Sequence, residues 1–389
     1  MNRTVVLALL STCLLPLTAY AELHAGFKTS EVTLATGSVE ITVWYPTPKK
    51  RSDGDAYHAI QTRSLLGVIG PPTQLVLPAR AKRDAPIKGG KHPLILNYTG
   101  GGQGNHLRLR DIRANELLAA RGYVVVAPGR NTTMLASQGP LLSSLIDYMF
   151  GESAFWDSID ANRIGARGAS FGGLGVLSLA GGDVLGNAPD DRVRAFVVDE
   201  SVSACADGWI PDCTSITRPL MLRDGSVFSG SDMATLFSDL DHAFPRFLVT
   251  LDNPAHISFS TGQCALIEAQ RQASLSYQMV EPEPRRIGYF PIGLGLGDTA
   301  GVDASLIWNL DLVAPTLGSA GDFCGPDFGG PVTPGLGSVL DNQAMIETLH
   351  ALNLGFWQTA FRDDRSKRTK LEKAASRLDT VQSITKITD

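Results

Sequence analysis

The stretch RIGARGASFGGLG, residues 163–175, places a single serine, Ser170, between Gly168 and Gly172. The residues before it, NRIGARG, have the pattern of a strand, and the residues after it, LGVLSLAGG, have the pattern of a helix. Ser170 therefore lies at a predicted strand-to-helix turn with the pattern G-x-S-x-G. Such a turn is sharp and strained, and side chains in place of its glycines would collide with neighbouring backbone. It lifts a hydroxyl clear of the sheet, as a nucleophilic serine requires.

Apolar runs of strand length recur along the chain, with helical patterns between them. This alternation predicts an α/β fold, with a mostly parallel central sheet of about eight strands flanked by helices. We expect the first two strands to be antiparallel. Several of the later runs are apolar without alternation, as in strands buried on both faces. The predicted strands are residues 28–35, 39–46, 93–98, 123–128, 162–168, 193–199, 219–224 and 245–252.

Two later regions depart from this alternation. Residues 258–340 are rich in Gly and Pro and weakly periodic, which predicts an insertion after the last strand that serves as a lid over the site. From residue 362, charged residues are mixed with apolar ones at Leu371, Ala374, Leu378 and Val381, so residues 362–389 are predicted to form an amphipathic helical tail. The catalytic domain is then expected over residues 22–361.

A nucleophilic serine needs a base, and His256 is the best placed of the seven histidines. It follows the last predicted strand, PRFLVTLD, on a loop at the strand's carboxyl end. In a parallel sheet this is the edge at which Ser170 is expected.

The base in turn needs a carboxylate that fixes its tautomer and stabilises the imidazolium. Asp199 ends the strand VRAFVVD, Asp224 ends the strand PLMLRD, and Glu200 is a weaker third candidate. Either aspartate gives the chain order Ser, Asp, His, which is the order of an α/β-hydrolase.

Negative charge that develops on a tetrahedral intermediate needs N–H donors fixed in advance. The glycine-rich loop NYTGGGQGN, residues 97–105, follows a strand and precedes a helix. We predict that the amides of Gly101 and Phe171 form the oxyanion hole. The same loop is not a dinucleotide-binding G-x-G-x-x-G turn, because Asn105 stands at the last glycine position.

The N-terminus predicts export. Arg3 precedes an apolar run from Val5 to Leu17, which ends in Ala19-Tyr20-Ala21, so residues 1–21 are interpreted as a signal peptide. No segment has the apolar length of a transmembrane helix, and the mature protein is expected to be periplasmic or extracellular.

Four cysteines remain after removal of the signal peptide, which favours disulfides in an exported chain. The proposed pairs are Cys205 with Cys213 and Cys264 with Cys324.

The composition excludes some functions. The chain has 389 residues and a net charge of −5, which does not suit a nucleic-acid partner. The chemistry predicted for Ser170 requires no cofactor and no metal.

The chain resembles the secreted α/β-hydrolases related to platelet-activating-factor acetylhydrolase and the bacterial dienelactone-hydrolase-like lipases. The resemblance is carried by ITVWYP, HPLILNYTGGG, ARGYVVVAPGR, DANRIGARGASFGG, AFVVDES and NPAHISF. In that family the acid ends the strand after the nucleophile helix, which implies Asp199, whereas cutinase-like and dienelactone hydrolases use the next strand, which implies Asp224. We favour Asp199. Family members usually carry His before the first Gly of the oxyanion loop, where this chain has Thr99. They carry His or Tyr before the nucleophile, where this chain has Ala169. These differences leave the substrate preference open.

These observations predict an exported serine hydrolase that cleaves a small-molecule or lipid carboxylic ester through an acyl-enzyme. The same triad would serve an amidase or peptidase. A hydrolase fold without activity, which binds a partner through residues 258–340, is the alternative from another class.

Overall fold

The structure is a computed structural model of the chain. The described residues are 23–61, 64–65, 68–69, 73–100, 105–129, 138–182, 188–201, 205, 213–225, 233–251, 261–262, 265–266, 269, 342–362, 371 and 381–387.

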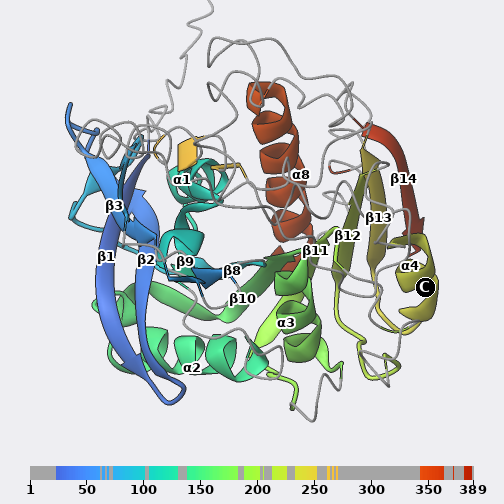
Figure 1. Cartoon of the computed structure of the whole chain (residues 1–389). Helices are drawn as coiled ribbons and strands as arrows, with labels where there is room; N and C mark the ends of the chain where they lie inside the picture. The colour runs from blue at the N-terminus through green and yellow to red at the C-terminus, as the bar shows by residue number, and fades with distance from the viewer. Residues whose placement is uncertain are drawn as a thin grey trace, which may run out of the picture.

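A ten-stranded sheet runs through the molecule in the order β14-β13-β12-β11-β10-β8-β9-β2-β1-β7 (Figure 1). The strands from β9 to β13 are parallel to one another, and β1 pairs with β2 in the antiparallel sense, as predicted. As predicted, this is an α/β fold with a mostly parallel sheet and helices on both faces. The strands are β1 (His24–Leu34), β2 (Gly37–Thr47), β7 (Lys82–Arg83), β8 (His92–Thr99), β9 (Val124–Pro128), β10 (Ile159–Ala169), β11 (Val193–Asp199), β12 (Leu220–Gly225), β13 (Arg246–Leu251) and β14 (Val381–Ile387).

The prediction of about eight strands was too low, because it missed both edges of the sheet. β7 adds two residues beside β1, and β14 lies antiparallel to β13. The expected helical tail is thus wrong for residues 381–387. Strand pairing explains the difference: β14 covers the exposed edge of β13, and Val381 and Ile384 pack against the core.

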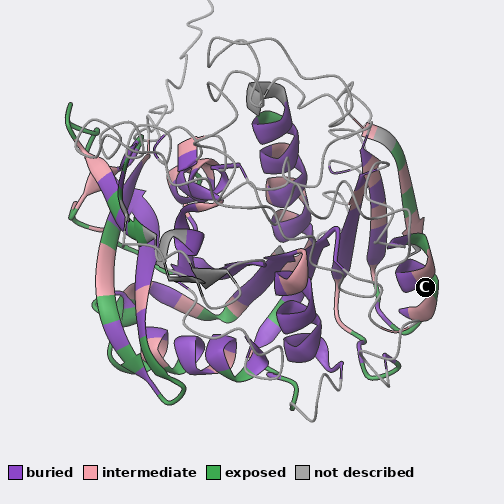
Figure 2. Cartoon of the chain, viewed as in Figure 1, coloured by how far each residue is buried: buried purple, intermediate pink, exposed green. Residues whose placement is uncertain are grey.

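The helices cover the sheet in two layers. α1 (Ile112–Ala120) and α8 (Asn342–Arg362) pack on one face, and α2 (Gln138–Gly151) and α3 (Phe171–Ala180) pack on the other. The apolar side chains along one side of α8 are buried, namely Met345, Leu349, Leu352 and Phe356. Figure 2 shows the buried strands between these layers. Shorter helices are η1 (Asn105–Leu109), η3 (Trp156–Ser158) and α4 (Met233–Asp239).

A small antiparallel pair, β3 (Ala56–Gln61) with β6 (Thr73–Pro78), packs on the α1 side of the domain, and β4 (Ser64–Leu65) pairs with β5 (Val68–Ile69). The Tyr57 hydroxyl of β3 accepts a hydrogen bond from Trp44 Nε1 at 2.8 Å and donates one to Glu116 at 2.9 Å. This ties β3 to both β2 and α1. Among the described helices, none is long and apolar enough to cross a membrane.

The expected lid, residues 258–340, lies outside the described residues apart from five positions between Thr261 and Ala269. Two of these, Leu266 and Ala269, are buried in the core on the α1 and α8 side. These described positions at the start of the predicted lid therefore pack into the domain.

Candidate active site

Ser170 is the single residue between the end of β10 and the start of α3. Its backbone has φ 54° and ψ −132°, a conformation that side chains adopt only under strain. From Ile164 to Gly182 every residue is buried except Ser170 and Phe171, which are half-buried. The strand, the turn and the helix thus present one hydroxyl at the sheet edge, as a nucleophile elbow does.

The glycines around Ser170 are required by close backbone contacts. A Cβ atom on Gly168 would lie 2.3 Å from the carbonyl oxygen of Gly172, and a Cβ atom on Gly172 would lie 2.1 Å from the carbonyl oxygen of Tyr98. Neither position can hold a side chain without a shift of backbone. Hydrogen bonds fix the turn further: the Ser170 N–H donates to the Asp199 carbonyl at 2.9 Å, and its own carbonyl accepts from the Gly173 N–H at 2.8 Å.

The loop that follows β8 reaches the first turn of α3. The Gly100 N–H donates to the Ala169 carbonyl at 2.8 Å, and a Cβ atom on Gly100 would lie 2.5 Å from the amide nitrogens of Phe171 and Gly172. Phe171 is the first residue of α3, and the first amides of a helix point out of its N-terminus. Gly101, predicted as the second oxyanion donor, lies outside the described residues, one position beyond this contact.

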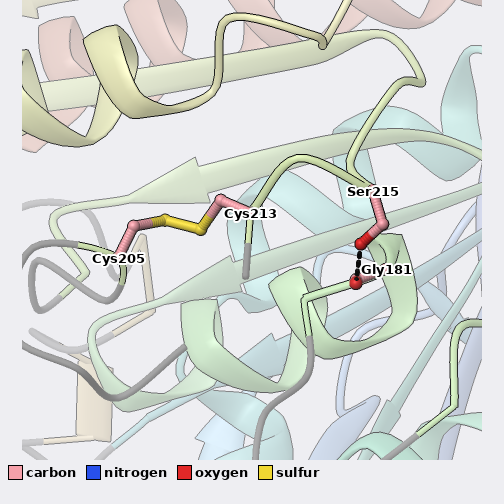
Figure 3. The surroundings of a disulfide bond; sticks show 4 residues. All are labelled: Gly181, Cys205, Cys213 and Ser215. Atoms are coloured by element: carbon pink, nitrogen blue, oxygen red, sulfur yellow. Dashed lines mark hydrogen bonds between the residues drawn. A yellow bond between two sulfur atoms is a disulfide. The ribbon is translucent and has the colours of Figure 1, made fainter. Parts of the chain in front are cut away.

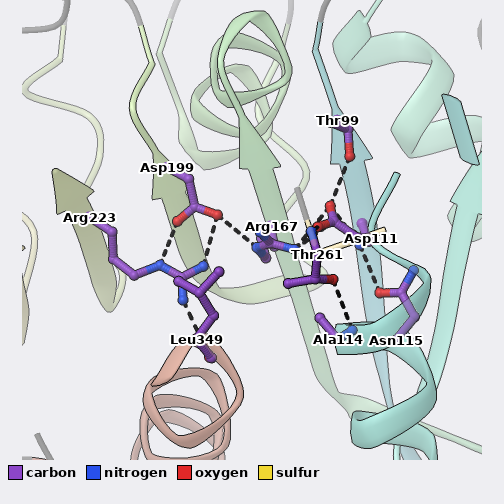
Figure 4. A network of polar contacts seen from close by, with 10 residues as sticks. Thr99, Asp111, Ala114, Asn115, Arg167, Asp199, Arg223, Thr261 and Leu349 are labelled. Carbon is purple, nitrogen blue, oxygen red and sulfur yellow. Dashed lines mark hydrogen bonds and ion pairs between the residues drawn. The ribbon is translucent and has the colours of Figure 1, made fainter. Parts of the chain in front are cut away.

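Asp199 ends β11 and lies beside Ala169 of β10. Its carboxylate is fully buried between two guanidinium groups (Figure 4). Arg167 Nε donates to Oδ2 at 2.7 Å, while Arg223 donates from Nε to Oδ1 at 2.5 Å and from Nη2 to Oδ2 at 2.8 Å. Burial acts to raise the pKa of Asp199, but Arg223 and Arg167 outweigh it and hold the pKa below its ordinary value.

Arg167 continues the network to Asp111, with Nη1 3.0 Å from Oδ2. Asp111 is buried and accepts hydrogen bonds from the Thr99 hydroxyl at 2.8 Å and from the Thr261 N–H at 3.1 Å. Figure 4 shows how these contacts join the end of β8, the strand before Ser170, the end of β11 and residue 261. The network therefore fixes the segments from which the predicted site is built. Its charged pairs give no sequence signal, because Arg167 and Asp111 are 56 positions apart.

Two other carboxylates lie at the same sheet edge. Glu200 directly follows β11, is fully buried, and has a positive φ of 36°. Asp224 is the penultimate residue of β12, lies beside Thr250 of β13, and is half-buried. The structure thus places Ser170, Phe171, Asp199, Glu200 and Asp224 at one edge. His256, the predicted base, lies outside the described residues, although the chain on both sides of it, at Leu251 and Thr261, is described.

One of the two predicted disulfides is present. Cys205 and Cys213 are bonded (Figure 3), between β11 and β12. Nearby, the Ser215 hydroxyl donates to the Gly181 carbonyl at the end of α3. Cys264 and Cys324 lie outside the described residues. Among the described residues, no three His, Cys, Asp or Glu side chains gather as a metal site would require.

A scan against models of protein families finds no match. The chain is 32% identical over 128 residues to dipeptidyl-peptidase 5 of Porphyromonas gingivalis. This matched segment covers 30% of this chain and 18% of that protein. The chain is also 40% identical over 65 residues to bis(hydroxyethyl) terephthalate hydrolase of Streptomyces coelicolor. That segment covers 16% of this chain and 21% of that protein. The matched segments thus span about a fifth of each relative.

Among solved structures, a ferulic acid esterase from Streptomyces cinnamoneus matches with a TM-score of 0.52 at 15% identity. The match covers 94% of this chain and 96% of the esterase. This likeness supports an α/β-hydrolase fold for the sheet and helices described above. The resemblance described from the sequence is therefore supported at the level of the fold and not at the level of the acetylhydrolase family.

Proposed function

We propose that this protein is an exported serine hydrolase that cleaves carboxylic esters. The observation that carries the proposal is the strained conformation of Ser170, half-buried between a buried strand and a buried helix. Backbone strain of this kind costs about 1–3 kcal/mol and persists where the surrounding structure imposes it, which is typical of active sites. A turn that only packed a helix would not need a serine in this conformation.

In the proposed reaction, Ser170 Oγ attacks the ester carbonyl carbon while its proton passes to His256. The oxyanion of the tetrahedral intermediate is held by the amides of Phe171 and Gly101. Collapse of the intermediate releases the alcohol, which takes the proton from His256. A water molecule, deprotonated by His256, then attacks the acyl-enzyme; the acid is released as the bond to Ser170 Oγ breaks, and His256 returns the proton to Ser170 Oγ.

The acid that orients His256 is a carboxylate at the edge formed by β11 and β12. Asp199 is the residue that the family resemblance implies, and Asp224 is the alternative on the next strand. The chemistry needs neither a metal nor a cofactor, because the nucleophile, base and oxyanion donors are all protein groups.

The similar proteins support an ester substrate and suggest its class. The name of the Streptomyces coelicolor relative describes hydrolysis of an ester of an aromatic acid, and the matching structure is of a ferulic acid esterase. We therefore propose a small aromatic or acyl ester as substrate. The match to a dipeptidyl-peptidase favours a peptidase as the second candidate, because the same triad cleaves amides.

A substrate series on the purified mature protein tests the proposal. We expect hydrolysis of p-nitrophenyl esters of acetate, butyrate, octanoate and benzoate, and a loss of about 10³-fold or more in kcat for Ser170→Ala. Dipeptidyl p-nitroanilides, tested in parallel, distinguish the peptidase. Hydrolysis of anilides but not esters would favour that second function, and equal rates for wild type and Ser170→Ala would contradict both.

A further inference from the structure

We propose that Arg167 is a positioning residue for the reaction: by binding two carboxylates at once, its guanidinium holds the backbone of Ser170 in the reactive orientation. This rests on the proposed serine-hydrolase function. Arg167 precedes Ser170 on β10 and is buried, so it acts on the substrate only through the nucleophile. Three observations carry the inference: the hydrogen bonds of the Ala169–Ser170 peptide, the contacts of Arg167 and the charge balance around it.

The peptide group between Ala169 and Ser170 is bound at both of its polar atoms. Its carbonyl accepts from the Gly100 N–H at 2.8 Å, and its N–H donates to the Asp199 carbonyl at 2.9 Å. Gly100 follows β8 and Asp199 ends β11, so the strands on either side of β10 hold this peptide. The orientation of the peptide sets the direction of the Ser170 side chain. Because the Ser170 conformation is strained, these neighbours must impose it.

The Arg167 guanidinium lies between two buried carboxylates, as Figure 4 shows. Its Nε donates to Asp199 Oδ2 at 2.7 Å, and its Nη1 lies 3.0 Å from Asp111 Oδ2. A guanidinium is planar and presents its N–H groups in a fixed fork, so two carboxylates bound to it are held at a fixed separation. A lysine ammonium at this position would offer a single point charge instead.

Both carboxylates belong to the segments that hold the peptide. Asp199 is itself the residue whose carbonyl accepts the Ser170 N–H. On the other side, Asp111 accepts the Thr99 hydroxyl at 2.8 Å, and Thr99 directly precedes Gly100. Arg167 therefore closes a ring of contacts that runs from one side of the peptide to the other. Loss of the guanidinium would release both sides together.

The charges of this ring are balanced within the protein. Asp111 and Asp199 supply two negative charges, and Arg167 and Arg223 supply two positive charges. Burial acts to lower the pKa of Arg167, but the two carboxylates outweigh it and hold the pKa above its ordinary value. Buried ion pairs often contribute no more to stability than apolar side chains of similar volume, whereas their hydrogen bonds fix a geometry. The network therefore suits a role in orientation.

The test compares the mature wild type with Arg167→Lys, which keeps the charge and loses the fork. It measures kcat and KM for p-nitrophenyl acetate and the rate at which a fluorophosphonate labels Ser170. We expect kcat and the labelling rate to fall by about 10–100-fold, with KM within about threefold of wild type. A contribution to stability alone would lower the melting temperature and leave the labelling rate of the folded protein unchanged.

Arg163→Lys is the matched control, because Arg163 also lies on β10 and pairs with a carboxylate, Asp160, at 2.6 Å nearer the surface. It should leave kcat, KM and the labelling rate unchanged. A second variant decides if Arg167→Lys does not fold. Arg167→Met combined with Asp111→Asn removes one charge of each sign, so the remaining buried pair stays balanced. We expect the same losses in it.

A folded Arg167 variant with kcat and labelling rate within about threefold of wild type would overturn the proposal. Failure of both variants to fold would assign Arg167 to stability and would overturn it as well. The labelling separates this inference from the proposed function. If wild-type Ser170 is labelled and the Arg167 variants are labelled at the same rate, only the inference about Arg167 fails. If wild-type Ser170 is not labelled, the proposed function fails, and this inference fails with it.

Discussion

Ser170, the proposed nucleophile, has a backbone conformation that is strained for any residue other than glycine. Removal of the side chain by Ser170→Ala leaves the strain in place, because alanine also has a Cβ atom. Ser170→Gly removes both the hydroxyl and the strain, since glycine tolerates positive φ. Pairs of this kind separate catalytic function from stability at one position.

We expect Ser170→Gly to be more stable than Ser170→Ala by about 1 kcal/mol. Relief of the strain contributes about 1–3 kcal/mol, and the larger chain entropy of unfolded glycine offsets about 0.5–1 kcal/mol of it. Urea or thermal unfolding of the two variants measures the difference. A Ser170→Gly protein less stable than Ser170→Ala would show that the turn is not strained. Both variants should be inactive.

Asp199 is expected to contribute to stability through its two arginines. Asp199→Asn removes a buried charge and leaves Arg167 and Arg223 with one carboxylate between them, so we expect a loss of about 3–5 kcal/mol in the free energy of unfolding. Chemical denaturation compares the variant with wild type. Asp160→Asn, on a carboxylate that pairs with Arg163 nearer the surface, is the control and should lose about 1 kcal/mol or less.

The pH dependence of stability follows from the lowered pKa of Asp199. A lowered pKa means that the unfolded chain binds the proton more tightly, so the stabilisation is complete above the unfolded value and is lost as the pH falls through the folded value. The wild type should therefore lose stability below about pH 4, and Asp199→Asn should lose less over the same interval. Unfolding measured at pH 2.5–6 tests this. Parallel pH curves for the two proteins would contradict it.

At the scale of elements, β14 closes one edge of the sheet. It pairs with β13 from Arg246 to Leu251, and Val381 and Ile384 pack against the core. An unpaired strand edge promotes association with other chains. We expect a chain that ends at residue 380 to melt at a lower temperature and to aggregate on heating. Size-exclusion chromatography and light scattering measure this, and an unchanged, monodisperse truncated protein would contradict it.

The elements show which parts of the fold could be predicted from sequence. The buried parallel strands were predictable, because each must be apolar on both faces and short, as VRAFVVD and PLILNY are. β14 was missed because its pattern is mixed, with one face on the core and the other exposed. The β-branched residues of VQSITKI were the available signal for a strand.

The candidate site was predictable only in part. G-x-S-x-G has a local steric cause, so it pointed to Ser170 and Phe171 directly. The partners of Asp199 were not predictable, because Arg167, Arg223 and Asp111 meet only once three strands and a loop are assembled. A position at the end of a strand identified candidate carboxylates, but it could not show which of them the arginines engage.

At the scale of the whole molecule, the fold explains why one serine is presented. The sheet, α3 and the loop after β8 converge on Ser170, and the buried network below them joins the segments on either side. The Cys205–Cys213 disulfide lies between β11 and β12 and suits the oxidising compartment that the N-terminal sequence predicts. We propose that this convergence activates the Ser170 hydroxyl.

The most direct measurement is to react the mature protein with a fluorophosphonate and to locate the adduct by peptide mass spectrometry. We expect one adduct, on Ser170 within the peptide GASFGGLGVLSLAGGDVLGNAPDDR, and none in Ser170→Ala or in protein unfolded before labelling. A folded, unlabelled wild type, or an adduct on another residue, would contradict it.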